Sequence, residues 1–252
     1  MPASPFEGLK PELLWKHFEA ITRIPRCSGN EAGVAEFVNE WAADRGFTVN
    51  SDAAGNLVVK VPATTGKESA PVVVLQGHLD MVCEKDSDSP IDFSRDAIPV
   101  KRDGDYLCAE GTTLGADNGM GLAAGMAVAE DPHAEHGPLE LLMTVDEETG
   151  LTGAQALEPG FLEGKIMLNL DSEEEGAVYV GCAGGSDTRC HVPVEREAGD
   201  GEAVTIKVAG LKGGHSGLDI NTGRGNAIKV LAWYLDRLRA RVADLALVSW
   251  SA

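Results

Sequence analysis

The sequence is poor in basic residues: 21 Lys and Arg stand against 40 Asp and Glu among 252 residues, which gives a net charge of -19. Nucleic acids and anionic membranes both attract a basic face, so we predict neither as a partner. No stretch of the sequence approaches the roughly 20 apolar residues that cross a bilayer. The first residues also lack the basic and apolar regions of a signal peptide. We therefore expect a cytoplasmic protein.

Three motifs that would indicate other chemistries are also missing. No CxxC pair links the five cysteines, and their odd number and wide spacing predict reduced thiols, not a disulfide framework. The absence of HExxH excludes a thermolysin-like zinc site. The glycine-rich stretch at 111–119 lacks the lysine of GxxxxGKS/T, so it is not predicted to hold a phosphate.

The hydrophobic pattern of the first two thirds predicts an α/β fold. Helical spacing predicts helices over residues 9–24, from about 31 to 45, and from 119 to the stop at 131–132. Apolar runs predict buried strands at 72–78, 139–145 and 166–170, with two more strands at 47–50 and 56–61. The polar segment 84–105 predicts an irregular excursion with at most short strands.

The pattern changes after residue 185. Residues 186–194 and 203–208 alternate polar and apolar side chains, as half-exposed antiparallel strands do. An amphipathic helix is predicted at 226–242 and a strand at 245–250. We expect a catalytic, metal-binding domain at 1–186 and the incomplete start of a second domain at 187–252.

Carboxylates follow each of the predicted buried strands. His78 and Asp80 end the first strand, the acidic run 146–148 follows the second, Asp171 follows the third, and Asp117 lies in a loop before a helix. The carboxyl ends of parallel strands meet at one edge of a sheet, where ligands usually bind. Because neighbouring carboxylates repel one another unless a cation holds them, the sequence predicts a metal site at this edge.

The donor types narrow the chemistry of this site. An imidazole among carboxylates favours zinc, manganese or cobalt over magnesium. If Asp117 gives one oxygen to each of two ions, a hydrolytic centre with ions roughly 3.5–4 Å apart results. One of Glu147 and Glu148 can then bind metal while the other carries a proton from water to the leaving amine, and the spacing leaves open which.

Five motifs carry a family resemblance: GHLDMV, GTTLGADNG, DEETGLTG, NLDSEE and GGHSG, in this order. They resemble the co-catalytic zinc peptidases, which include peptidase T, carboxypeptidases and aminoacylases, and the surrounding sequence is most similar to the aminoacyl-histidine dipeptidases of that family. The resemblance implies a mixed, mostly parallel sheet flanked by helices, followed by the first part of an α+β (ferredoxin-like) lid. It implies hydrolysis of Xaa-His dipeptides such as carnosine, and a homodimer formed through the complete lid.

The resemblance also implies a set of metal ligands. His78 and Asp171 would hold one zinc, Glu148 the other, and Asp117 would bridge both. Relatives place a cis peptide directly after the bridging aspartate, so we expect one between Asp117 and Asn118.

The remaining roles follow from the same resemblance. Asp80 would orient His78, Glu147 would be the general base and acid, and His215 of the lid would polarise the substrate carbonyl, in relatives often from the partner subunit. In the family a later segment supplies a last histidine ligand for the second zinc, and none of the other histidines here fits that place: His17, His133, His136 and His191. The chain therefore resembles the N-terminal part of such an enzyme.

Two alternatives remain open. The same centre could remove acyl groups from N-acyl amino acids, or the chain could be a truncated homologue that binds one metal and dimerises without turnover. Substrate profiling separates the dipeptidase from the deacylase. The completeness of the lid separates the dipeptidase from the truncated homologue.

Overall fold

The computed structural model divides into two compact units, Met1–Ala177 and Val178–Ala252. Every residue discussed below as part of the candidate metal site lies in the first unit. The structure describes residues 4–172, 174–182, 184, 186, 188–199, 201–214, 219, 221–242 and 244–251.

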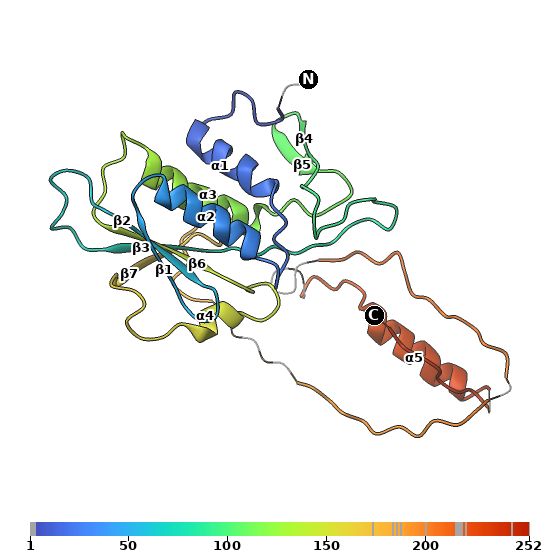
Figure 1. The fold of residues 1–252 in the computed structure, drawn as a ribbon. Helices are drawn as coiled ribbons and strands as arrows, with labels where there is room; N and C mark the ends of the chain where they lie inside the picture. Colours follow the sequence, from blue (N-terminus) through green and yellow to red (C-terminus); the bar gives the residue numbers. More distant parts are fainter. Residues whose placement is uncertain are drawn as a thin grey trace. The chain divides into compact units, whose positions relative to one another are not determined.

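A five-stranded mixed sheet forms the centre of the first unit (Figure 1), with the strand order β1-β2-β6-β3-β7. The three neighbouring strands β6, β3 and β7 run parallel, and β2 and β1 continue the sheet antiparallel. The carboxyl ends of the three parallel strands therefore lie at one edge, as the sequence predicts. The strands are β1 (Thr48–Ser51), β2 (Leu57–Val61), β3 (Val73–His78), β6 (Leu139–Thr144) and β7 (Ile166–Asn169).

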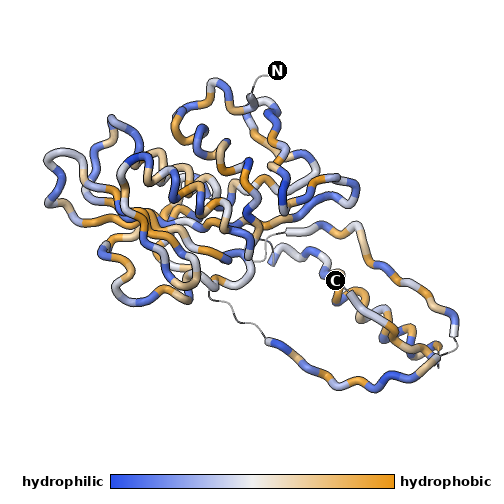
Figure 2. The backbone as a smooth tube through the Cα atoms, in the orientation of Figure 1, coloured by the Kyte–Doolittle hydropathy of each residue, from blue (hydrophilic) through white to orange (hydrophobic). Residues whose placement is uncertain are grey.

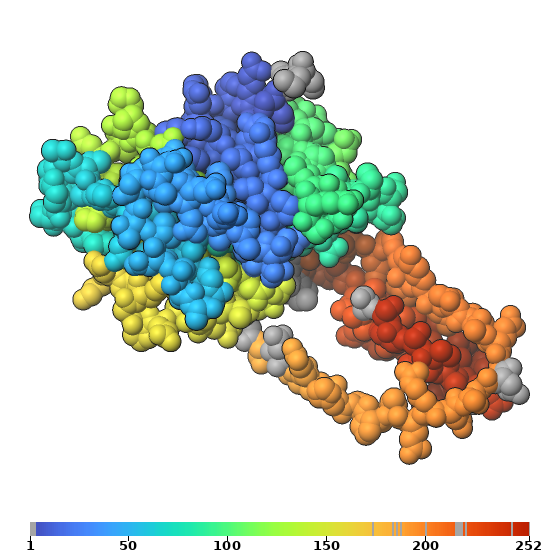
Figure 3. Space-filling model, in the orientation of Figure 1, coloured from blue at the N-terminus to red at the C-terminus, as the bar shows by residue number. Residues whose placement is uncertain are grey.

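Helices α1 (Glu12–Thr22), α2 (Ala32–Ala43) and α3 (Ala116–Glu130) lie on one face of this sheet. Helix α1 ends three residues before Pro25, which cannot continue a helix. All three helices contribute buried apolar side chains to one core with β2 and β6. Figure 2 shows the hydrophobic residues gathered in the central strands, and in Figure 3 α1 and α2 form a continuous surface over them.

The alternation of side chains along the strands supplies both faces of the sheet. Leu57 and Val59 of β2 face the helices, whereas Val58 faces a smaller apolar cluster on the other side. That cluster is covered by the chain that follows the short helix α4 (Thr152–Ala156). Every residue of β6 is buried, as expected for a central strand covered on both faces.

The polar excursion between β3 and α3 contains one hairpin, β4 (Val100–Asp103) with β5 (Tyr106–Ala109). The prediction of at most short strands in this region is confirmed.

The prediction that the strand at 166–170 is buried was wrong. In β7 the apolar side chains of Ile166, Met167 and Leu168 are 46–51% exposed. The reason is position: among the described strands β7 is the edge of the sheet and pairs with β3 alone. An apolar run predicts burial only where neighbours cover it.

In the second unit, α5 (Ala227–Arg239) confirms the predicted helix and begins where the side chain of Asn226 accepts a hydrogen bond from the N–H of Lys229 at 2.9 Å. The strands predicted around it were wrong for the described residues of 186–194, 203–208 and 245–250, which form no strand. An alternating pattern becomes a strand only where a partner strand accepts its hydrogen bonds. None of the helices described in the two units is both long enough and apolar enough to cross a membrane.

The cysteines also require a correction. Cys27 and Cys83 form a disulfide, with their Cα atoms 5.7 Å apart. The sequence separation of 56 residues hid this pair, because a parallel bridge between Cys27 and Met81 brings the chain after α1 beside the chain leaving β3. Cys108, Cys182 and Cys190 are free thiols, as predicted.

Candidate metal centre

Side chains from three segments meet at the carboxyl edge of the sheet. His78 is the last residue of β3 and is 1% exposed, Asp117 lies near the start of α3, and Asp171 follows β7. The Nε2 atom of His78 lies 2.9 Å from Oδ1 of Asp117 and 3.8 Å from Oδ1 of Asp171. One atom from each of the three side chains falls within 4.8 Å of the others, a separation that lets a single ion contact all three.

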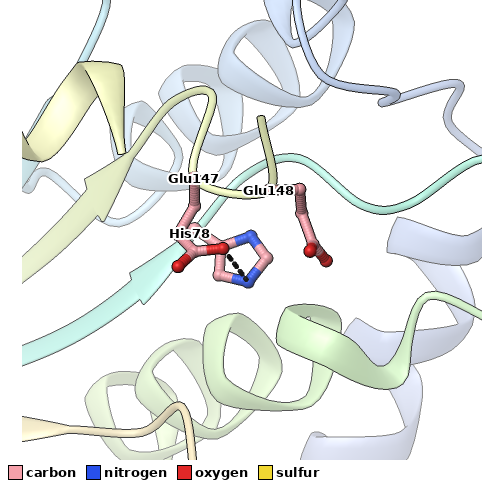
Figure 4. Close-up of side chains that lie close together, drawn as sticks. All are labelled: His78, Glu147 and Glu148. Atoms are coloured by element: carbon pink, nitrogen blue, oxygen red, sulfur yellow. Dashed lines mark ion pairs between the residues drawn. The ribbon is translucent and has the colours of Figure 1, made fainter. Parts of the chain in front are cut away.

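The loop after β6 brings two more carboxylates to the same imidazole. Figure 4 shows Glu147 and Glu148 beside the ring of His78, which comes from β3. Oε2 of Glu147 lies 3.9 Å from Nε2 of His78, and the three side chains form a second group of possible ligands within 4.8 Å. The candidate ligands and Glu147 are thus brought together around one imidazole.

Asp80 occupies the other side of the same ring. The Nδ1 atom of His78 lies 3.2 Å from Oδ1 and 3.0 Å from the carbonyl oxygen of Asp80, so Nε2 is the nitrogen that faces the other carboxylates. Asp80 is fully buried and accepts hydrogen bonds from the N–H groups of Glu147 and Glu148 and from the hydroxyl of Ser28, at 2.7–3.2 Å. A carboxylate in this place holds the orientation of a ligating histidine.

The backbone at Asp117 departs from the helix in which it lies. Asp117 and Asn118 have non-helical φ/ψ angles, and the peptide between them is cis, as expected from the resemblance. The side-chain amide of Asn118 donates to the carbonyl of Leu170 at 2.9 Å and to Oδ1 of Asp171 at 3.0 Å, and its oxygen accepts from the N–H of His78. Asn118 thereby joins the ends of β3 and β7 to the loop that carries Asp117.

The six side chains His78, Asp80, Asp117, Glu147, Glu148 and Asp171, here called the His78 cluster, hold an excess of negative charge. Burial, together with neighbouring Asp117, raises the pKa of Asp171 to about 6, and burial is the main cause of the raised pKa of Glu147 and of Glu148. Burial alone would lower the pKa of His78, but hydrogen bonds to Asp117 and Asp80 outweigh it and raise that pKa to about 10.

The donor set fits a divalent cation. An imidazole nitrogen with several carboxylate oxygens is a ligand set for zinc, manganese or cobalt. Within the described part of the chain, no second histidine joins the groups of possible ligands around Glu147 and Glu148. His17 lies on α1 and His136 between α3 and β6, whereas His215 lies outside the described residues.

Three residues to which the sequence analysis gave no role in the site support the cluster: Arg26, Ser28 and Asn118. Asn118 directly follows Asp117, so its place in the motif was a usable signal. Arg26 and Ser28 come after α1 in a segment whose visible signals were the end of one helix and the capping residues of the next. Their contacts with the chain after β3 arise from tertiary structure alone.

Comparisons with known proteins agree with this geometry. The profile described as peptidase family M20/M25/M40 matches residues 74–215, more than half of the chain. The cytosol non-specific dipeptidase of Escherichia coli is 45% identical over 250 residues, 98% of this chain and 51% of that protein. An uncharacterized protein of Bacillus subtilis, YqjE, is 29% identical over 213 residues, 77% of this chain and 54% of its own length.

Solved structures show the same relation. The aminoacylhistidine dipeptidase of Vibrio alginolyticus matches with a TM-score of 0.71 and 43% identity, over 95% of this chain and 49% of that one. The aminopeptidase PepT of Bacillus cereus matches with a TM-score of 0.56 and 27% identity, over 65% and 44%. The chain spans about half the length of the curated relatives it matches. With a family profile that runs from β3 through the Asp117 loop and beyond β7 to residue 215, the chain belongs to peptidase family M20/M25/M40.

Proposed function

We propose that this chain forms the metal-binding part of a dipeptidase that hydrolyses Xaa-His dipeptides such as carnosine. The observation that carries the proposal is the orientation of His78: Nδ1 is held by Asp80, and Nε2 faces Asp117 and Asp171. The names of the relatives support the reaction type, since one is a cytosol non-specific dipeptidase and another an aminoacylhistidine dipeptidase.

In this proposal each side chain of the His78 cluster has one role, and that of Asp80 is to orient His78. His78 and Asp171 would hold one ion, Glu148 would hold a second, and Asp117 would contribute to both. Divalent ions bound there would polarise the scissile carbonyl and lower the pKa of a water molecule. Glu147 would accept a proton from water and return it to the leaving amine, a task helped by burial, which raises the pKa of its carboxyl.

We propose zinc as the metal, with manganese or cobalt as replacements. The first site has an imidazole and two carboxylates, whereas Glu148 has no described histidine beside it other than His78. The first site should therefore bind zinc more tightly than the second.

Three further parts of the proposal extend to the longer protein that the relatives represent. Residues 1–186 are the catalytic domain, and 187–252 begin a lid through which two chains dimerise. His215 of the lid polarises the substrate carbonyl. The enzyme works in the cytosol, the compartment that the name of its Escherichia coli relative gives.

The experiment begins with metal-free protein to which zinc, manganese or cobalt is returned. We expect one tightly bound zinc per chain and zinc-dependent cleavage of carnosine or Gly-His. His78→Ala should lose the metal, and His136→Ala, a histidine outside the cluster, should keep it.

Three other results would change the proposal. Cleavage of an N-acetyl amino acid in place of dipeptides would identify a deacylase. One bound zinc with no turnover would favour the non-catalytic homologue. Two tightly held zinc ions per isolated chain would show that the second site needs no further histidine.

A further inference from the structure

Arg26 is a buried cation directly behind the His78 cluster. Its side chain is among the largest that are fully buried, and the whole residue is 2% exposed. Burial is the main cause that lowers its pKa, but the value stays at about 10, so the guanidinium is charged at neutral pH. A charged group in such a position is costly unless its N–H groups are hydrogen-bonded.

The backbone around Arg26 is attached to the chain that leaves β3. The carbonyl of Arg26 accepts a hydrogen bond from the N–H of Met81 at 3.1 Å, and Cys27 forms the parallel bridge with Met81. The disulfide from Cys27 to Cys83 closes the same contact covalently. The starting point of the Arg26 side chain is therefore fixed relative to the end of β3.

The guanidinium connects two loops that carry residues of the cluster. Nη1 donates to the carbonyl oxygens of Leu79 and Asp80, at 2.9 and 2.7 Å. Nη2 donates to the carbonyl oxygen of Gly115, two residues before Asp117. One planar group thus connects the loop after β3 with the loop before α3. A guanidinium can do this because its N–H donors point in more than one direction.

The surroundings leave this group little freedom. A Cβ at Gly115 would come within 2.7 Å of Nη2, and a Cβ at Gly119 within 2.8 Å of the same atom. Two glycines therefore make the space that the guanidinium fills.

We propose that Arg26 is a positioning residue of the metal site, whose guanidinium sets the spacing between the loop with Asp80 and the loop with Asp117. This rests on the proposed function, because it assumes that His78 and Asp117 share an ion. Arg26 contacts neither Nε2 of His78 nor the carboxylate of Asp117 in any described hydrogen bond, so it acts through the backbone. Partners that orient metal ligands typically change metal affinity by about 10–100-fold.

The test compares cobalt binding by the metal-free chain, Arg26→Lys and Arg45→Lys. Lysine keeps the positive charge but has one ammonium in place of the fork. We expect Arg26→Lys to bind the first Co²⁺ ion about 10–100-fold more weakly and with an altered visible absorption spectrum. Arg45 is a partly buried arginine that pairs with Glu130, outside the His78 cluster. Its variant should bind Co²⁺ as the unaltered chain does.

Two outcomes would overturn the inference in different ways. If the unaltered chain binds no Co²⁺, the proposed function fails and the inference with it. If the unaltered chain binds Co²⁺ and Arg26→Lys matches it in affinity and spectrum, the inference alone fails.

A second measurement avoids the risk that Arg26→Lys does not fold. In the unaltered chain labelled with ¹⁵N-arginine, we expect the Nη protons of Arg26 to exchange slowly with water and to show restricted rotation. Their resonances should shift when Zn²⁺ is added, since the two loops respond to the ion. Free rotation, or no shift with bound Zn²⁺, would show that Arg26 does not hold the loops.

Discussion

Two clusters of charged side chains in the first unit differ in the balance of charge. In the Glu130 cluster, formed by Lys16, His17, Trp41, Arg45 and Glu130, one carboxylate faces several N–H groups. Glu130 lies 2.9 Å from His17 Nε2, 2.5 Å from Arg45 Nη2 and 3.3 Å from Lys16 Nζ, and Trp41 donates to it at 3.1 Å. These contacts join α1, α2 and α3 into one layer.

The His78 cluster has the opposite proportion, with five carboxylates facing one imidazole. Burial raises the pKa of Asp171, Glu147 and Glu148, whereas in the other cluster the pKa of Glu130 falls to about 2 although burial opposes that fall. A cluster that stabilises its carboxylate needs no further partner. A cluster with more carboxylates than positive charges is suited to binding a cation. This difference between the two clusters can be tested.

The largest expected effect is on turnover. Glu147→Ala should lower the rate of the complete enzyme by about 10²–10⁴-fold while the metal content stays nearly unchanged, because a proton carrier need not be a ligand. Metal content by atomic emission and initial rates on Gly-His check this. If Glu147→Ala loses metal while Glu148→Ala keeps it, the two roles are reversed.

The Glu130 cluster should respond in stability instead. Glu130→Gln removes the charge that Arg45 and Trp41 bond to, and we expect it to lower the free energy of unfolding by about 1.5–3 kcal/mol with zinc affinity unchanged. Urea unfolding of the metal-free chain measures this. Glu19→Gln is the matched control, because its pair with Arg23 is exposed and should contribute roughly 0–1 kcal/mol. Equal losses for both variants would contradict the distinction.

Asp80→Asn should affect the metal but leave a folded protein. The amide can still accept hydrogen bonds but no longer supplies the charge that holds the proton on Nδ1 of His78. Zinc affinity should fall by about 10–100-fold. Competition with a chelator of known affinity measures it, and unchanged affinity would show that the ring is oriented by the carbonyl of Asp80 alone.

Acid should weaken the Glu130 cluster in two steps. Burial lowers the pKa of His17 below 6.5, so the folded state binds fewer protons there and stability falls as the pH drops below that value. The pKa of Glu130 is lowered from 4.5 to about 2, so its contribution is present above 4.5 and is lost as the pH falls toward 2. The stability difference between the unaltered chain and Glu130→Gln should shrink over that second range, and a constant difference would contradict the assignment.

The smallest expected effect is a proton count. In the metal-free chain the pKa of His78 is about 10, so at pH 7 the ring carries a proton that a ligating nitrogen cannot keep. Zinc binding at pH 7 should release about one proton from it. Calorimetry in two buffers of different ionisation enthalpy measures this number, and no release would show that the ring is already neutral.

Much of the site was predictable because its residues follow strands. The apolar run at 72–75 and the pair His78 and Asp80 indicate a strand that ends in a ligand and its partner. The runs before Asp171 and before Glu147 repeat that pattern, and parallel strands bring their ends together. Local sequence therefore indicated which side chains meet, since an apolar run and the residue that follows it are neighbours in the chain, even where the strand is exposed as in β7.

Tertiary structure decided what local sequence could not express. The exposure of Ile166 in β7 depends on its place at the sheet edge, and the disulfide of Cys27 with Cys83 depends on a bridge across 56 residues. Arg26 reaches Gly115 across 89 residues, and nothing in either short segment indicates the other. The contacts of Arg26 and Cys27 depend on the pairing of the chain after α1 with the chain after β3, which hydrophobic spacing along one segment does not specify.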